Sequence, residues 1–91
     1  MLREYEIGRI VISKRGRDKG HPFVIVGIDG VYLYLADGKL RKLEKPKKKK
    51  PIHVQITESI SQETAGKLAA GSLRDADLRK VLLRFGNSGE V

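Results

Sequence analysis

Two clusters of positively charged side chains are the residues of this sequence that could do chemistry. The first cluster, the basic loop, spans residues 14–20 and holds four cations against one acid, Asp18. The second cluster, the lysine-rich segment, spans residues 39–50 and holds eight cations against one acid, Glu44. Flexible cations of this kind bind phosphate groups and release the counterions that surround a nucleic acid. We predict phosphate contacts from Lys14, Arg15, Arg17, Lys19, Lys39, Arg41, Lys42, Lys45, Lys47, Lys48, Lys49 and Lys50.

The alternative interpretation of both clusters is a solvated surface that serves solubility. Glycine favours binding at the basic loop, because Gly16 and Gly20 let the backbone approach a phosphate closely. Gly20 is a candidate binding residue as well, although a structural role explains it more simply. Phosphate contacts position a nucleic acid without reading its bases, so little sequence specificity is expected. Because both clusters follow strand ends in one small β-unit, we expect them to form one binding face.

The sequence offers no combination of residues for catalysis or for binding a cofactor. It contains no cysteine, no Walker loop, no Ser/His/Asp arrangement and no plausible pair of carboxylates. His21 and His53 are too few for a metal site in the absence of cysteine. We therefore expect no enzyme activity, metal, cofactor or small-molecule substrate. His53 is a candidate for a hydrogen bond to RNA beside the lysine-rich segment, and a plain surface histidine is the simpler interpretation.

Composition and charge indicate one small domain with a polyanionic partner. The 91 residues are 40% hydrophobic, which allows only a thin core. The net charge is +8, and residues 1–56 carry all of the excess, with 14 Lys and Arg against 6 Asp and Glu. Charge concentrated in this way favours binding to a polyanion. No apolar run approaches the ~18–20 residues of a membrane span, and no secretory leader is visible, so we expect a cytoplasmic protein.

Residues 1–56 show the rhythm of short strands separated by turns. Runs of β-branched and alternating apolar residues predict five strands, at about residues 9–14, 22–28, 31–36, 39–43 and 52–56. Asp29-Gly30 and Asp37-Gly38 predict tight turns around the third strand. The four adjacent lysines between Pro46 and Pro51 predict an extended, solvated loop, because like charges repel one another. The last strand is expected to close a small barrel.

Residues 57–91 predict two short helices. Ser59 or Ser61 can cap a first helix that runs to about Ala70 and stops at Gly71. A second helix begins at Ser72 and ends near residues 86–89, followed by a frayed tail. Its apolar stripe consists of Leu78, Val81, Leu82 and Phe85.

The second predicted strand is apolar on both faces and therefore needs cover on both sides. One face carries Val24, Val26 and Ile28, and the other carries Phe23 and Ile25. The barrel interior can bury one set, and the C-terminal helices can shelter the other. Tyr32 and Tyr34 share a face of the third strand, where packing against these helices is favoured over stacking on RNA bases.

The basic loop and its flanking strands resemble a KOW motif, which occurs in ribosomal proteins and transcription-elongation factors. The resemblance lies in an apolar strand, the loop Gly16-Arg-Asp-Lys-Gly20 and a second apolar strand, with Gly20 at the family's characteristic glycine. Residues 35–50, Leu-Ala-Asp-Gly-Lys-Leu-Arg-Lys-Leu-Glu-Lys-Pro-Lys-Lys-Lys-Lys, are similar to a narrower group. That group is the small bacterial KOW proteins that resemble a large-subunit ribosomal protein of archaea and eukaryotes. The resemblance covers roughly residues 5–55 and implies an SH3-like barrel whose loop touches RNA.

The sequence thus predicts a mainly β fold, a small SH3-like barrel of about five strands with a short helical appendage. The barrel is assigned to residues 1–56 and the helices to residues 57–91. The expected function is non-enzymatic binding of structured RNA, and the resemblance implies ribosomal RNA, with ribosomal proteins as further partners in translation. The main alternative is an adaptor that docks on an acidic protein surface, and architectural DNA binding is a third. A membrane partner is not expected, because no basic amphipathic helix accompanies the lysines.

Overall fold

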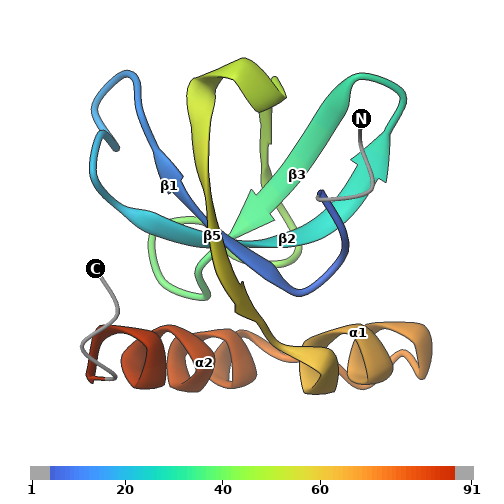
Figure 1. Cartoon of the computed structure of the whole chain (residues 1–91). Coiled ribbons are helices and arrows are strands. Elements are labelled where there is room, and N and C mark those ends of the chain that lie inside the picture. The colour runs from blue at the N-terminus through green and yellow to red at the C-terminus, as the bar shows by residue number, and fades with distance from the viewer. Residues whose placement is uncertain (1–4, 88–91) are drawn as a thin grey trace.

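The computed structural model describes residues 5–87 and shows a five-stranded antiparallel sheet with two helices (Figure 1). The strands are β1 (Arg9–Ser13), β2 (Pro22–Asp29), β3 (Tyr32–Ala36), β4 (Lys47–Lys49) and β5 (Val54–Ile60). A turn of 3₁₀ helix, Pro51–His53, joins β4 to β5, and the helices are α1 (Gln62–Ala69) and α2 (Asp75–Asn87). The predicted fold class, a mainly β, barrel-like domain with a short C-terminal helical appendage, is confirmed.

The sheet is a meander whose last strand returns beside the first. Its order is β4-β3-β2-β1-β5, and each pair of neighbouring strands is antiparallel. The two outer strands are consecutive in the chain and are linked by the short 3₁₀ turn, so the sheet curls toward a barrel. Figure 1 shows this curved sheet on one side of the molecule, with α1 and α2 lying along the other.

Two apolar cores lie on opposite faces of β2, as its two-sided pattern predicts. The first core consists of Val11, Phe23, Ile25, Leu33, Leu35 and Val54. The second consists of Ile10, Val24, Val26, Ala36 and Leu78, with Val81, Leu82 and Phe85 packed against it. The apolar stripe of α2 therefore covers the outer face of the sheet.

Residues 39–43, predicted as the fourth strand, form a loop instead. The buried carboxylate of Asp37 accepts hydrogen bonds from the N–H groups of Lys39 and Arg41, at 3.0 and 2.7 Å. The C=O of Arg41 in turn accepts from the N–H groups of Asp37 and Gly38. These local bonds occupy backbone groups that a strand would use for its ladder, and so the segment curls.

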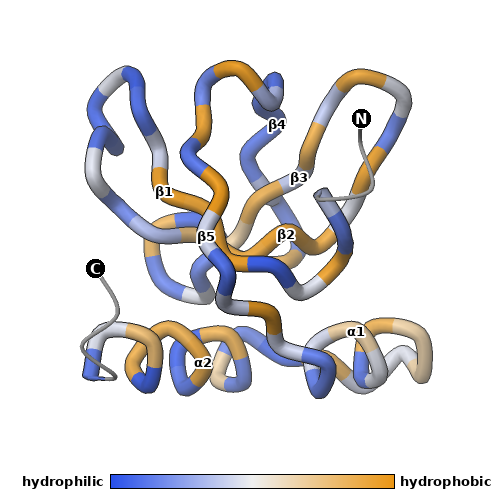
Figure 2. The backbone as a smooth tube through the Cα atoms, viewed as in Figure 1, coloured by the Kyte–Doolittle hydropathy of each residue, from blue (hydrophilic) through white to orange (hydrophobic). Residues whose placement is uncertain are grey.

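The fourth strand is formed by the lysine run itself, so the prediction of a solvated loop there is wrong. In β4, Lys47, Lys48 and Lys49 pair with Leu35, Tyr34 and Leu33 of β3. Adjacent lysines of the run are separated because alternate side chains point to opposite faces of the strand. Lys47 contacts Asp18 of the basic loop, and Lys49 contacts Arg15 of that loop and Ser13 of β1, whereas Lys48 is exposed to solvent. Figure 2 shows β4 and the basic loop as hydrophilic stretches beside the apolar strands.

Several other elements are shifted by a few residues from their predicted positions. β5 continues to Ile60, so the predicted division between residues 56 and 57 falls inside a strand. The turn between β2 and β3 is centred on Gly30 and Val31, because Asp29 pairs with Tyr32. Gly30 has φ +62°, a conformation that favours glycine.

The outward face of β2 also differs from its predicted pattern. A register shift between Ile25 and Gly27 interrupts the alternation of side chains along the strand. Ile28, predicted to lie with Val24 and Val26, is therefore 41% exposed. A bulge of this kind cannot be read from apolar alternation alone.

The first helix follows its predicted capping residues, whereas the second begins three residues later than predicted. Ser61 caps α1, with its Oγ accepting a hydrogen bond from the N–H of Thr64 at 3.1 Å, and Gly71 follows the end of this helix. α2 begins at Asp75 rather than Ser72 and continues through Asn87. The predicted frayed tail over residues 88–91 lies outside the described residues.

Candidate nucleic-acid interface

Two lysine side chains join the basic loop to β4. Nζ of Lys49 donates hydrogen bonds to Oγ of Ser13 at 2.6 Å and to the C=O of Arg15 at 3.1 Å. Nζ of Lys47 forms an ion pair with Oδ2 of Asp18 at 2.5 Å. These contacts connect residues that are 36, 34 and 29 positions apart in the sequence. The structure thus brings the basic loop and the end of the lysine-rich segment into direct contact.

An open hollow of about 370 Å³, which we call the basic hollow, lies where these two segments meet. Its lining residues are Arg15, Gly16, Tyr32, Lys47, Lys48, Lys49, Lys50 and His53. Five of these eight residues are Lys or Arg, and none is acidic. Lys14, Arg17 and Lys19 of the basic loop are also exposed. Cations gathered on one surface raise the local potential and attract anions.

Lys47 and Lys49 have a structural task within this cluster. Lys49 is 8% exposed, and its ammonium group donates to Oγ of Ser13 in β1 and to the C=O of Arg15 in the basic loop. Burial, followed by the charge of Lys47, holds the pKa of Lys49 below its ordinary value. The hydrogen bond from Lys47 holds the pKa of Asp18 below its ordinary value. The exposed cations Arg15, Lys48 and Lys50 are therefore the ones free to reach a ligand at the hollow.

His53 lies on the rim of the basic hollow, in the 3₁₀ turn rather than in a strand. Its C=O accepts a hydrogen bond from the N–H of Lys14 at 2.9 Å, which joins the basic loop to the 3₁₀ turn that follows β4. Partial desolvation, then the positive charges of Arg15, Lys49, Lys50 and Lys14, keep the pKa of His53 below its ordinary value. The imidazole is thus neutral at pH 7 and can donate or accept a hydrogen bond.

The other candidate cations of the lysine-rich segment lie outside the basic hollow. Lys39, Arg41, Lys42 and Lys45 are exposed on the loop between β3 and β4. This loop is fastened to α2, because the N–H of Leu43 donates to Oδ1 of Asp75 and the Arg79 guanidinium donates to the C=O of Gly38. The predicted single face therefore contains residues 47–50 at its centre, while residues 39–45 lie on the α2 side of the sheet (Figure 1).

Asp37 anchors the same loop to the base of the basic loop. Its Oδ2 lies 2.7 Å from Nε2 of His21, and its Oδ1 accepts the two backbone hydrogen bonds that curl the segment. Burial disfavours the charged carboxylate, but the donors from Arg41, Lys39 and His21 outweigh it, so the pKa of Asp37 lies below its ordinary value. Asp37 and His21 thus hold two cationic loops in fixed positions.

The structural interpretation of Gly20 agrees with its geometry. Gly20 has φ +88°, and its N–H donates to the C=O of Ser13 at 2.7 Å, closing the basic loop. A side chain at this position would have open space but an unfavourable backbone conformation. Gly20 therefore shapes the loop that presents Arg15 and Arg17.

Tyr32 is the residue of the hollow that sequence reasoning placed wrongly. Tyr34 packs against the second core as predicted, but Tyr32 lines the basic hollow, with Nζ of Lys48 4.3 Å from the centre of its ring. Ser13, which holds Lys49, was not singled out at all. Alternation along β3 puts Tyr32 and Tyr34 on one face, so it could not have separated their surroundings. Recognition of residues 47–49 as a strand would have placed Lys48 beside this face and Lys49 on the opposite one.

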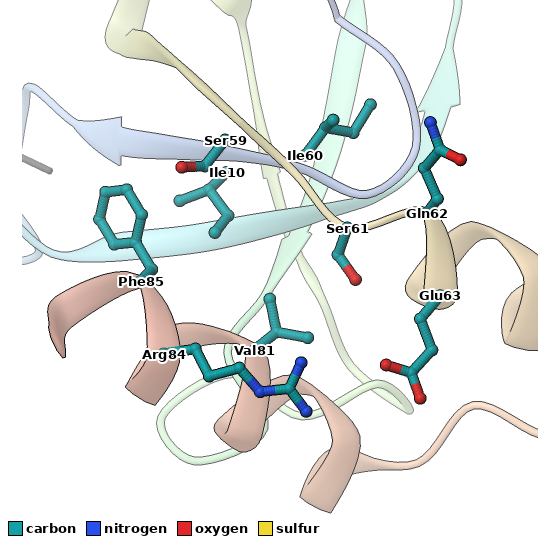
Figure 3. A pocket seen from close by; sticks show the side chains of 9 residues that line it. All are labelled: Ile10, Ser59, Ile60, Ser61, Gln62, Glu63, Val81, Arg84 and Phe85. Carbon is teal, nitrogen blue, oxygen red and sulfur yellow. The ribbon is translucent and has the colours of Figure 1, made fainter. Parts of the chain in front are cut away.

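A second hollow of similar volume, about 370 Å³, lies at the other end of the sheet, against α2. Figure 3 shows Ile10, Val81 and Phe85 around it, together with Glu63 and Arg84. These charged residues have opposite signs, so this hollow has no preference for a polyanion.

Comparison with known proteins leaves the family open, since no protein-family model and no curated protein matches the sequence. The KOW resemblance therefore stays a prediction. Among residues 5–87, no helix has the length and apolar character that crossing a membrane requires. Within the same part of the chain, no three metal-ligating side chains gather into a potential ion site.

Proposed function

We propose that this chain is a non-enzymatic RNA-binding module of the KOW type, which binds structured RNA through phosphate contacts and shape. The observation that carries the proposal is the basic hollow, where cations from two distant segments gather without an acidic lining residue. Like charges on one surface repel one another, and a polyanion relieves that repulsion. The KOW resemblance makes cytoplasmic ribosomal RNA the expected target, with ribosomal proteins as neighbouring partners.

Recognition through the backbone suits both the ligand and the protein. A-form RNA hides the base edges of its major groove and presents phosphates and 2′-hydroxyls. The exposed side chains of Arg15, Lys48 and Lys50 are long and flexible, which suits contacts that need charge and reach more than fixed geometry. The ties through Lys47 and Lys49 hold the two cationic segments at a fixed separation, so their phosphate contacts are made in register.

The double variant Lys48→Ala/Lys50→Ala tests this proposal. It should weaken binding to all structured RNAs alike and flatten the log–log dependence of affinity on salt by roughly 1.5, because two phosphate contacts are lost. The affinity of each protein for an RNA hairpin is measured over a series of salt concentrations. Arg74→Ala/Lys80→Ala removes the same charge from exposed positions in and beside α2, and it should leave the slope nearly unchanged.

Equal salt dependence of RNA affinity in the wild type and in Lys48→Ala/Lys50→Ala would mean that Lys48 and Lys50 only confer solubility. Tighter binding to an acidic protein surface than to RNA would support the adaptor function instead. If duplex DNA competes for the protein as strongly as structured RNA does, architectural DNA binding would be indicated.

The His53 imidazole should report the bound phosphates through its pKa. In the free protein desolvation and nearby cations depress this pKa. Bound phosphates offset those cations and raise it, so the complex takes up a proton and affinity rises as the pH falls through the pKa of the complex. Proton NMR of His53 at a series of pH values, with and without RNA, measures the shift. His53→Gln should remove this part of the pH dependence, and an unchanged His53 titration would place the RNA elsewhere.

A further inference from the structure

The basic hollow contains an aromatic ring that phosphate binding does not use. Tyr32 lines the hollow at the first position of β3, next to the ammonium group of Lys48. The other four Phe and Tyr residues of the chain, Tyr5, Phe23, Tyr34 and Phe85, pack in or against one of the two cores. The ring of Tyr32 belongs to neither core and is placed among cations instead.

The surface beside the hollow is apolar. A neighbouring hollow of about 340 Å³ is lined by Val31, Lys50, Pro51 and Ile52, so the two hollows share Lys50. Val31 is 62% exposed and Ile52 is 73% exposed. A phosphate group alone uses only the charge of this surface. A nucleotide that has left its helix offers both a phosphate and a flat, largely apolar base.

We infer that the basic hollow receives one unpaired nucleotide of the RNA, with its base stacked on Tyr32 and its phosphates on Arg15, Lys48 and Lys50. This inference rests on the proposed function and specifies the RNA feature that is bound, a bulged or looped nucleotide rather than a continuous duplex. A volume of about 370 Å³ lies at the small end of the range of ligand sites, ~300–1,000 Å³, which suits a single nucleotide.

The contact between Lys48 and Tyr32 shows what occupies the face of the aromatic ring before a base binds. A cation over a tyrosine ring is attracted by the negative face of the ring, and in the free protein Lys48 holds that position. A base that stacks on the ring displaces the ammonium group of Lys48. The phosphate of the same nucleotide then pairs with the displaced ammonium group. Stacking accepts any base, so the site should select an unpaired nucleotide without selecting its identity.

Two RNA hairpins that differ in one feature test the inference. One carries a single bulged 2-aminopurine, and the other has the same stem with 2-aminopurine paired. Wild type should bind the bulged hairpin about tenfold more tightly and change its fluorescence, because stacking alters the emission of this base. Tyr32→Leu should lose this preference and the fluorescence change, whereas Tyr32→Phe keeps the aromatic face and should retain both.

The outcomes separate the inference from the proposed function. Equal binding of both hairpins by wild type, with no effect of Tyr32→Leu, would overturn the unpaired-nucleotide site and leave RNA binding intact. Binding of neither hairpin would refute the proposed function itself. Displacement of the bulged hairpin by a poly-glutamate peptide, equally from wild type and Tyr32→Leu, would show that the hollow selects charge alone. Thermal melting of each variant establishes that affinities are compared between folded proteins.

Discussion

Alanine in place of Leu78 should lower the free energy of unfolding by about 2–5 kcal/mol, the usual range for a buried leucine. The Leu78 side chain is completely buried, at 0% exposure, in the core between α2 and the outer face of the sheet. A domain of this size has a total stability of only about 5–15 kcal/mol, so much of the fold depends on this contact. Urea unfolding followed by circular dichroism measures the change.

Leu83 provides a matched control on the same helix. It is 65% exposed, and Leu83→Ala should change the stability by no more than about 0.5 kcal/mol. Equal losses in the two variants would mean that α2 does not act as the cover of the sheet. A Leu78→Ala protein that stays folded and loses only RNA affinity would make α2 a direct contact element.

The parts of the fold that follow from apolar periodicity could be predicted from the sequence. The stripe from Leu78 to Phe85 identified the covering face of α2, because side chains three and four positions apart share a helix face. The two-sided pattern of β2 predicted that this strand separates two cores. Periodicity did not rank the members of the stripe, and it is the structure that makes Leu78 fully buried while Leu82 is partly exposed.

The fourth strand could not be predicted, because its stability comes from contacts distant in sequence. Four consecutive lysines have poor strand character on their own. The strand is stabilised because Lys49 donates hydrogen bonds to Ser13 at the end of β1 and to the C=O of Arg15, and because Lys47 pairs with Asp18; Arg15 and Asp18 lie in the basic loop. Conversely, residues 39–43 alternate like a strand, but the Asp37 carboxylate captures their backbone N–H groups.

The same distant contacts decide which lysines of the site bind the protein and which stay exposed, so these roles could not be predicted from the sequence. Charge density alone indicated both cation clusters, and it gave every lysine the same role. All four lysines line the hollow, but Lys47 and Lys49 bind the protein itself, whereas Lys48 and Lys50 are exposed. This division depends on which face of β4 each side chain occupies, and so on the register of β3 and β4.

Reversing the charges of Arg15 and Arg17 to glutamate should reduce the affinity for structured RNA on the order of 100-fold, while the protein stays folded. Both side chains are exposed, so the substitution removes two cations and adds two anions without disturbing a core. The C=O of Arg15 still accepts from Lys49, because the substitution leaves the backbone in place. RNA affinity and thermal melting are measured on the same preparations.

Two further variants separate charge, position and loop shape. Arg74→Glu/Lys80→Glu makes the same change in net charge at exposed positions in and beside α2, and it should cost much less affinity. Gly20→Val should instead lower the melting temperature, because a β-branched residue is strained at φ +88°. Near-wild-type affinity in the folded Arg15/Arg17 variant would remove the basic loop from the interface and leave only β4 and Lys50. If Arg74→Glu/Lys80→Glu loses as much RNA affinity as the Arg15/Arg17 variant does, net charge and not the basic hollow determines RNA binding.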